Sequence, residues 1–183
     1  MNREQLLTPE HEAKEAWVVE LSHFIVEANI NTWAAEGAEV EPERPGYQEL
    51  EYKKGLWRLR DSYTGYFRAP GMTTVYYKDT PAWNMQYGGH GMTEGYEDRA
   101  KATFNFLKSA LMKVTPELPY RGPLHHQDGD YNYDFRLLNG DIMDCLWEEK
   151  IREKGMLTFT QTGMAGIIIP RDASKKPRFP WNL

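Results

Sequence analysis

The chain has 183 residues, of which 40% are hydrophobic and 27% charged, with a formal net charge of −5. This length fits one ordinary domain, and no apolar run approaches the roughly 20 residues of a membrane helix, so we expect a single domain over residues 1–183 with no membrane contact. The negative charge argues against a direct nucleic-acid partner. The single cysteine, Cys145, and an N-terminus without a signal-peptide pattern predict a cytoplasmic location.

The N-terminal segment predicts an amphipathic helix from about Pro9 to Ala35. Thr8 offers an N-cap hydroxyl and Pro9 occupies the first helical position. Apolar side chains recur at three- and four-residue spacing, which places them on one helix face: Trp17, Leu21, Phe24, Ile25 and Ala28. Gly37 then ends the helix, residues 38–46 form a linker, and residues 47–52 are a candidate edge strand.

The stretch from Trp57 to Gly91 predicts an antiparallel meander, because β-branched and aromatic residues alternate with Gly, Pro and Asp punctuation. In its first strand, Asp61 shares a face with Trp57 and Leu59 and is therefore a polar residue on an apolar face. Its last strand carries a second apolar row, formed by Trp83, Met85 and Tyr87.

A second helix over Glu97–Val114 and a second meander over Tyr131–Gly166 follow. Asn139-Gly140 is a strong hairpin signal, and Glu149 is the polar residue on the apolar face of the next strand. The basic, proline-containing end, residues 170–183, predicts an extended tail.

The two halves align at an offset of 75 residues, which matches four pairs: Gly65 with Gly140, Gln86 with Gln161, Gly88 with Gly163, and Gly91 with Gly166. This similarity predicts an α+β fold made of a duplicated α-βββ unit, with repeats at about 9–92 and 94–169. The two helices are then expected to pack on one face of a single antiparallel sheet. The other face would expose many aromatic side chains, so we expect a homodimer.

Four features are distinctive when taken together: Asp61-Ser-Tyr-Thr-Gly65, Pro81-Ala-Trp-Asn-Met-Gln-Tyr-Gly-Gly89, Arg121-Gly-Pro123 and Glu149. Together they resemble an uncharacterised prokaryotic domain family whose members occur alone or C-terminal to an Xre-type helix-turn-helix. In residues 68–74, where members often carry a glycine and a glutamate, this chain has Arg-Ala-Pro-Gly-Met-Thr-Thr, so a two-carboxylate role shared by both halves is not implied. No helix-turn-helix precedes the domain, so direct transcriptional control is not implied either, and the resemblance brings no activity.

Metal and cofactor motifs are weak. Asp128, Asp130 and Asn132 have the spacing that opens a calcium loop, but Tyr133 and Asn139 stand where glycine and a bidentate glutamate are required. No zinc-type spacing of histidine and cysteine occurs either. We therefore expect no metal and no cofactor.

The candidate ligand-binding residues combine aromatic walls with charged anchors: Asp61, Tyr63, Trp83, Tyr87, Arg121 and Glu149. A carboxylate on an aromatic face must be paired or protonated, and Arg121 is a plausible partner. Two interpretations stay open, a buried salt bridge that serves only the fold and a small-molecule pocket in which Arg121 anchors an anionic or carbonyl group. The expected function is binding of a small organic ligand or a protein, in a sensor-like domain. The alternative is a small hydrolase or isomerase that uses Asp61 or Glu149 with a histidine.

Overall fold

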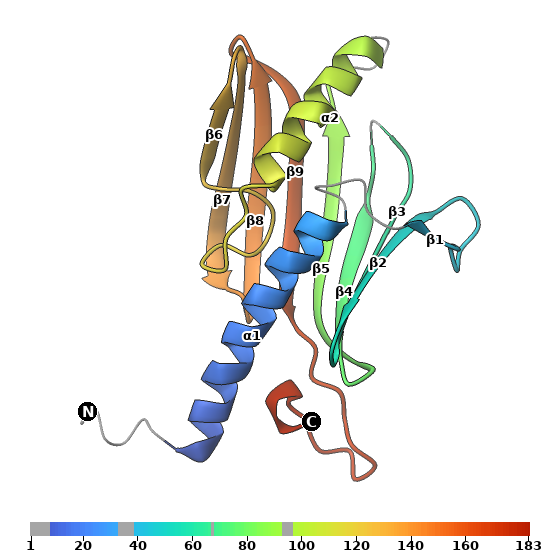
Figure 1. The fold of residues 1–183 in the computed structure, drawn as a ribbon, viewed down its shortest axis with the longest axis vertical. Coiled ribbons are helices and arrows are strands. Elements are labelled where there is room, and N and C mark those ends of the chain that lie inside the picture. Colours follow the sequence, from blue (N-terminus) through green and yellow to red (C-terminus); the bar gives the residue numbers. More distant parts are fainter. Residues whose placement is uncertain (1–7, 33–38, 67, 93–96) are drawn as a thin grey trace.

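The structure is a computed structural model that describes residues 8–32, 39–66, 68–92 and 97–183. Its centre is one nine-stranded antiparallel sheet with the order β1-β2-β3-β4-β5-β9-β8-β7-β6 (Figure 1). The strands are β1 (Glu39–Val40), β2 (Gln48–Lys54), β3 (Trp57–Tyr63), β4 (Gly71–Tyr77), β5 (Thr80–Gly91), β6 (His125–Asp128), β7 (Tyr131–Asp141), β8 (Asp144–Glu153) and β9 (Met156–Ile167). β5 and β9 pair at the centre, where Tyr87 lies opposite Gly163.

Two helices, α1 (Pro9–Asn31) and α2 (Glu97–Leu111), accompany the sheet. The Thr8 cap is confirmed, since its side-chain oxygen accepts a hydrogen bond from the His11 backbone N–H. α1 contacts β2 and β3, whereas α2 contacts β7, β8 and β9. The proposed stop at Gly37 lies outside the described residues.

The prediction of a duplicated α-βββ unit with both helices packed on one face is wrong. The candidate edge segment became β2, which pairs along its whole length with β3, and the segment before the second meander became β6, which pairs with β7. Each helix is therefore followed by at least four strands, and each contacts its own set of strands. Isolated edge segments are hard to identify from sequence, because their pairing partner decides whether they are strands.

The alignment of the two halves at an offset of 75 residues does not match structurally equivalent positions. It matches Gln86 with Gln161, yet Gln86 is exposed whereas Gln161 is buried and donates a hydrogen bond to Glu149. It also matches Gly88, which has open space around it, with Gly163, which packs against Trp147. Side chains alternate between the faces of a strand, so an alignment that is one residue out of register pairs residues from opposite faces.

Asn139-Gly140 does not form the hairpin turn. The last paired residues of this hairpin are Asp141 and Asp144, so the turn falls at residues 142–143. Gly140 has a φ of +72°, and a Cβ at this position would meet the Asp144 carbonyl oxygen at 1.9 Å. The register shifts between Leu137 and Asn139, and the dipeptide therefore belongs to a β-bulge, where glycine is also favoured.

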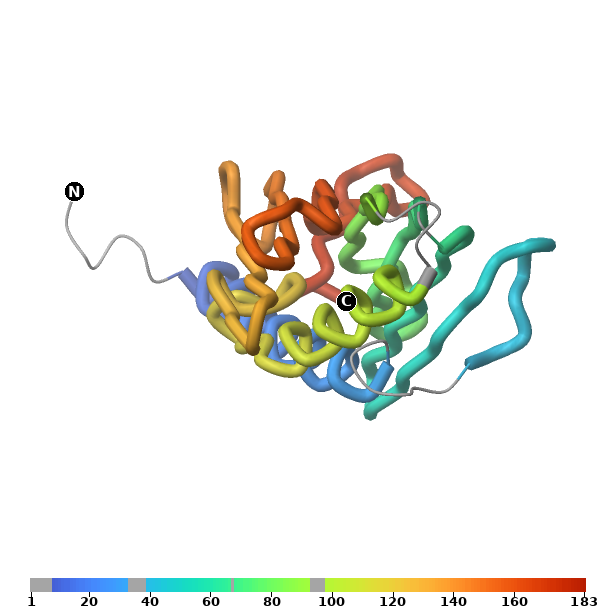
Figure 2. Tube along the Cα trace, turned by 90° about the horizontal axis from the view of Figure 1, so that it is seen from above, coloured from blue at the N-terminus to red at the C-terminus, as the bar shows by residue number. Residues whose placement is uncertain are grey.

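The hydrophobic core contains side chains from both helices and from the sheet. Its largest fully buried side chains include Trp83, Trp147, Leu21, Ile25 and Leu59, and we call the side of the sheet that carries Leu59, Trp83 and Trp147 the core face. The opposite side, the outer face, carries ion pairs such as Arg60–Glu49 together with exposed apolar side chains such as Leu146 and Met164. At one edge, β1 is only two residues long and projects from the body of the molecule (Figure 2), which limits edge-to-edge pairing with another chain.

The chain ends in a short 3-10 turn, Pro180–Asn182, that is packed against the body of the protein. The Trp181 ring lies 6.0 Å from the Trp17 ring of α1, and Lys78 Nζ donates a hydrogen bond to the Leu183 carbonyl oxygen at 2.7 Å. Residues 171–178 are exposed, whereas the turn that follows them is docked.

Candidate functional site

A cavity of about 500 Å³ lies between α2 and the core face of the sheet. Its walls are mostly apolar and include Tyr66, Phe104, Leu107, Leu111 and Phe159. The Phe104 ring contacts the rings of Tyr66 and Phe159 edge-on, at centroid distances of 5.3 and 5.9 Å. This size and lining are typical of sites for small organic molecules, which occupy roughly 300–1,000 Å³.

The polar part of the lining contains a buried carboxylate, Asp61, which projects from the middle of β3. Its Oδ1 accepts a hydrogen bond from Thr73 Oγ1 at 2.6 Å, and the Tyr87 hydroxyl donates to Oδ1 and Oδ2 at 3.1 and 3.0 Å. Burial raises the pKa of Asp61 from 3.8 to about 6, because these hydrogen bonds and the attraction of Arg121 offset only part of the lost hydration. Burial and Asp61 together raise the pKa of Tyr87 well above its ordinary value, so this hydroxyl remains a donor.

Arg121, from the segment between α2 and β6, also lines the cavity and forms a buried ion pair with Glu149. Its Nε and Nη2 lie 3.0 and 2.9 Å from Glu149 Oε1. Glu149 also accepts hydrogen bonds from the Tyr133 hydroxyl at 2.7 Å and from Gln161 Nε2 at 2.9 Å. Burial disfavours the charge on Arg121, but Glu149 outweighs this effect and raises the pKa of Arg121, so the guanidinium stays charged. The central carbon of this guanidinium lies 5.6 Å from the centre of the Tyr87 ring. Tyr87 therefore lies between the Arg121–Glu149 ion pair and Asp61, to which its hydroxyl donates.

The six predicted residues fall into three groups. Asp61, Tyr63, Tyr87 and Arg121 line the cavity. Glu149 is fully buried behind Arg121, and is not part of the lining. Trp83 lies apart from the cavity in the core, where its Nε1 donates a hydrogen bond to the Ile142 carbonyl oxygen at 2.9 Å.

The sequence did not predict two parts of the cavity lining, the apolar side chains of α2 and the amide of Gln161. Leu107 and Leu111 line the cavity, but their helical spacing is equally typical of core residues and cannot separate core from cavity lining. Gln161 had a usable signal, since it alternates with Phe159 and is therefore polar on the apolar face of β9.

No cluster of three or more metal-ligating side chains is found among the described residues. Asp128 and Asp130 flank the turn between β6 and β7, where Asp130 pairs with Lys154 at 3.3 Å. His126 stacks on Phe106 and lies within hydrogen-bond distance of Ser109. Asp130 and His126 therefore make local contacts at the β6–β7 edge of the sheet.

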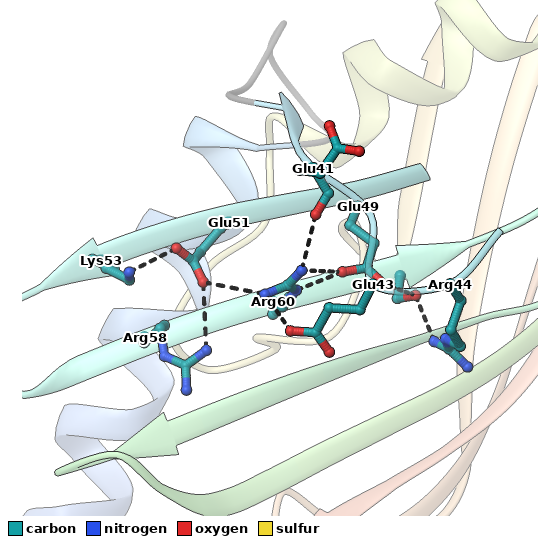
Figure 3. A network of polar contacts seen from close by, with 9 residues as sticks. Glu41, Glu43, Arg44, Glu49, Glu51, Lys53, Arg58 and Arg60 are labelled. Atoms are coloured by element: carbon teal, nitrogen blue, oxygen red, sulfur yellow. Dashed lines mark hydrogen bonds and ion pairs between the residues drawn. The ribbon is translucent and has the colours of Figure 1, made fainter. Parts of the chain in front are cut away.

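The outer face of β2 and β3 carries a self-contained charge network (Figure 3). Arg60 pairs with Glu49 at 2.5 Å and with Glu43 at 2.9 Å, and the Ser62 hydroxyl donates to Glu49 at 2.9 Å. Burial alone would raise the pKa of Glu49, but Ser62 and Arg60 outweigh burial and lower it. Because these charges satisfy one another, we place the candidate site at the cavity on the core face.

The outer face also has a groove of about 750 Å³, which runs across the central strands. Its apolar lining includes the exposed side chains of Leu138, Leu146 and Met164. It lacks a buried charged side chain such as Asp61 or Arg121, which would orient a small ligand.

Among the described residues, neither helix is long and apolar enough to cross a membrane. No curated protein and no solved structure matches the chain. One family model does match, over residues 61–168, and it is described as a domain of unknown function, DUF5680. This match begins at the buried Asp61, includes Arg121 and Glu149, and covers more than half of the sequence, so the chain belongs to the DUF5680 family.

Proposed function

We propose that this domain binds a small organic molecule in the cavity between α2 and the core face. The observation that carries the proposal is the position of two buried charged groups, Asp61 and Arg121, in the lining of an otherwise mostly apolar cavity. Buried charges are costly unless they are paired or used, and apolar walls with a few buried polar groups are the usual composition of a binding site.

The roles divide along the lining. Phe104, Leu107 and Phe159 offer apolar surface to the body of a ligand, while Asp61 and Tyr87 meet its polar end. The resemblance to domains found behind an Xre-type helix-turn-helix supports a sensory use of such a cavity. A cytoplasmic location stays a prediction from the sequence.

The alternative, a hydrolase or isomerase, draws support from the raised pKa of Asp61, because a carboxylate that titrates near 6 can act as a general base. The version predicted from the sequence also requires a histidine, and no histidine is among the described residues that line the cavity. Ligand binding therefore explains both the apolar walls and the charged groups of the cavity, whereas proton transfer explains Asp61 alone.

Native mass spectrometry of the purified protein tests the proposal directly. We expect a retained small molecule that is lost in Ala69→Trp, which places an indole in the cavity lining. The matched control is Ala102→Trp, an exposed position on α2 outside the cavity, which should keep the ligand. Equal retention by both variants would show that the molecule binds elsewhere.

We also infer that a second copy of the chain covers the groove on the outer face. Leu138, Leu146 and Met164 expose apolar surface there, which monomers seldom leave uncovered, and a symmetric dimer is the commonest closed assembly. Light scattering should report a dimer for the wild type and for Leu124→Lys, an exposed leucine outside the groove, and a monomer for Leu146→Lys. A monomeric wild type across a wide concentration range would contradict this assembly.

A further inference from the structure

We infer that the cavity selects ligands that carry an organic cation, such as a protonated amine, at the end that reaches Asp61. This inference rests on the proposed binding function and specifies the chemistry of its ligand. It also shifts the anchoring role from Arg121, the residue favoured by the sequence, to Asp61.

The first argument is the charge balance of the buried groups. Asp61, Glu149 and Arg121 are 2%, 0% and 6% exposed, so two carboxylates share one guanidinium. Glu149 receives two contacts from Arg121 and further hydrogen bonds from Tyr133 and Gln161. With Asp61 ionised, these three buried groups therefore carry a net charge of −1, which a cationic ligand neutralises and an anionic ligand worsens.

The second argument is the set of groups around Asp61. Both of its hydrogen-bond donors, Thr73 and Tyr87, are neutral. Among the described ion pairs none includes Asp61, although Arg121 attracts it from a longer distance and Glu49 of β2 repels it.

The other titratable groups of the lining do not reverse this balance. Tyr63 has a pKa raised by burial and by Asp61, so it remains neutral. Lys108 projects from α2 at an exposed position, where water and salt screen its charge.

The third argument is independent of charge count and concerns the walls. Tyr63, Tyr66, Tyr87, Phe104 and Phe159 present aromatic rings to the cavity. Ring faces attract cations, and the attraction is stronger where the contact is shielded from water. One cation, Arg121, already lies over the Tyr87 ring. A buried carboxylate surrounded by aromatic rings is a suitable environment for an ammonium group.

The test compares three probes with the same naphthyl body and two-carbon arm but different ends: 2-(1-naphthyl)ethylamine, 2-(1-naphthyl)ethanol and 1-naphthylacetate. By isothermal titration calorimetry at pH 7.5, the amine should bind at least about tenfold more tightly than the alcohol, and the carboxylate most weakly. Asp61→Asn should remove the tenfold preference for the amine over the alcohol. Asp98→Asn, an exposed position on α2, should change none of the three.

Proton competition gives a second readout. The amine needs the ionised carboxylate, so its affinity should fall by about tenfold per pH unit below the pKa of Asp61, while the affinity of the alcohol stays flat. If the alcohol or carboxylate bound as tightly as the amine and Ala69→Trp abolished their binding, the inference would fall while the cavity remained a binding site. No binding of any probe at millimolar concentration, with no retained molecule in the mass spectrum, would overturn the proposed function as well.

Discussion

The two halves of the sheet each bury one carboxylate on the core face, Asp61 in β3 and Glu149 in β8, but the surroundings of these two groups differ. Glu149 is held by a guanidinium, a phenol and an amide, and it is shut off from the cavity. Asp61 is held by two neutral hydroxyl groups and lines the cavity. A buried acid that pairs with a cation of the protein serves the fold, whereas a buried acid with only neutral hydrogen-bond donors remains available to a cationic ligand.

The largest effect should follow from removing the charge of Glu149. Glu149→Gln leaves the guanidinium of Arg121 buried without its counter-ion, and breaking a buried pair costs about 3–5 kcal/mol. Urea denaturation at pH 7.5 measures this loss. Glu148→Gln, its neighbour on the outer face, should cost less than about 1 kcal/mol. Similar losses of unfolding free energy in both variants would mean that the buried Arg121–Glu149 pair contributes no more to stability than a pair on the outer face.

The next effect concerns the pH dependence caused by Asp61. Its pKa rises from 3.8 to about 6 on folding, so the native state binds more protons than the unfolded state between these values. The stability contribution of protonated Asp61 is complete below about pH 4 and is lost as the pH rises through 6. This loss amounts to about 3 kcal/mol.

Asp61→Asn should therefore lose this pH dependence, because the amide keeps an acceptor for Thr73 and Tyr87 without the charge. The difference between the unfolding free energies of variant and wild type, followed from pH 4 to pH 7.5, isolates the contribution of Asp61. A constant difference across this range would mean that Asp61 keeps an ordinary pKa.

A double-mutant cycle sharpens the assignment of Arg121 to Glu149. Arg121→Met combined with Glu149→Gln removes both charges and keeps one of the two oxygen acceptors that Tyr133 and Gln161 use. The double variant should be more stable than the sum of the single losses predicts, by about 2 kcal/mol. Additive losses would show that the two charges do not depend on one another.

The smallest predicted effect distinguishes the phenol donors. Tyr87→Phe removes one of the two donors to Asp61, so at pH 7.5 it should cost about 1 kcal/mol, and at pH 4 much less because Asp61 is then protonated. Tyr133→Phe affects Glu149 and also leaves the Gly122 N–H without its acceptor, so its cost should persist at both pH values. Thermal unfolding at the two pH values measures both variants.

The sequence alone determined the features that depend on local periodicity. The spacing of apolar residues located the described length of α1, and the Thr8–Pro9 signal located its start. Strand alternation placed Asp61 with Leu59 and, in β8, Glu149 with Trp147, on the buried side of their strands. These features follow from the 3.6- and 2-residue periods of the backbone, which are written directly into the sequence.

Tertiary structure decided what depends on a distant partner. Whether β6 is a strand is set by β7, with which it pairs, and Asn139-Gly140 fits a bulge as well as a turn, so the number of strands could not be read locally. Arg121 comes from an irregular segment without periodicity, and only folding brings its guanidinium to Glu149 instead of Asp61. In the part of the chain that the structure describes, Asp61 is left with the hydroxyl groups of Thr73 and Tyr87 as its hydrogen-bond donors, because pairing among buried charges is governed by distances across the fold and not by spacing along the chain.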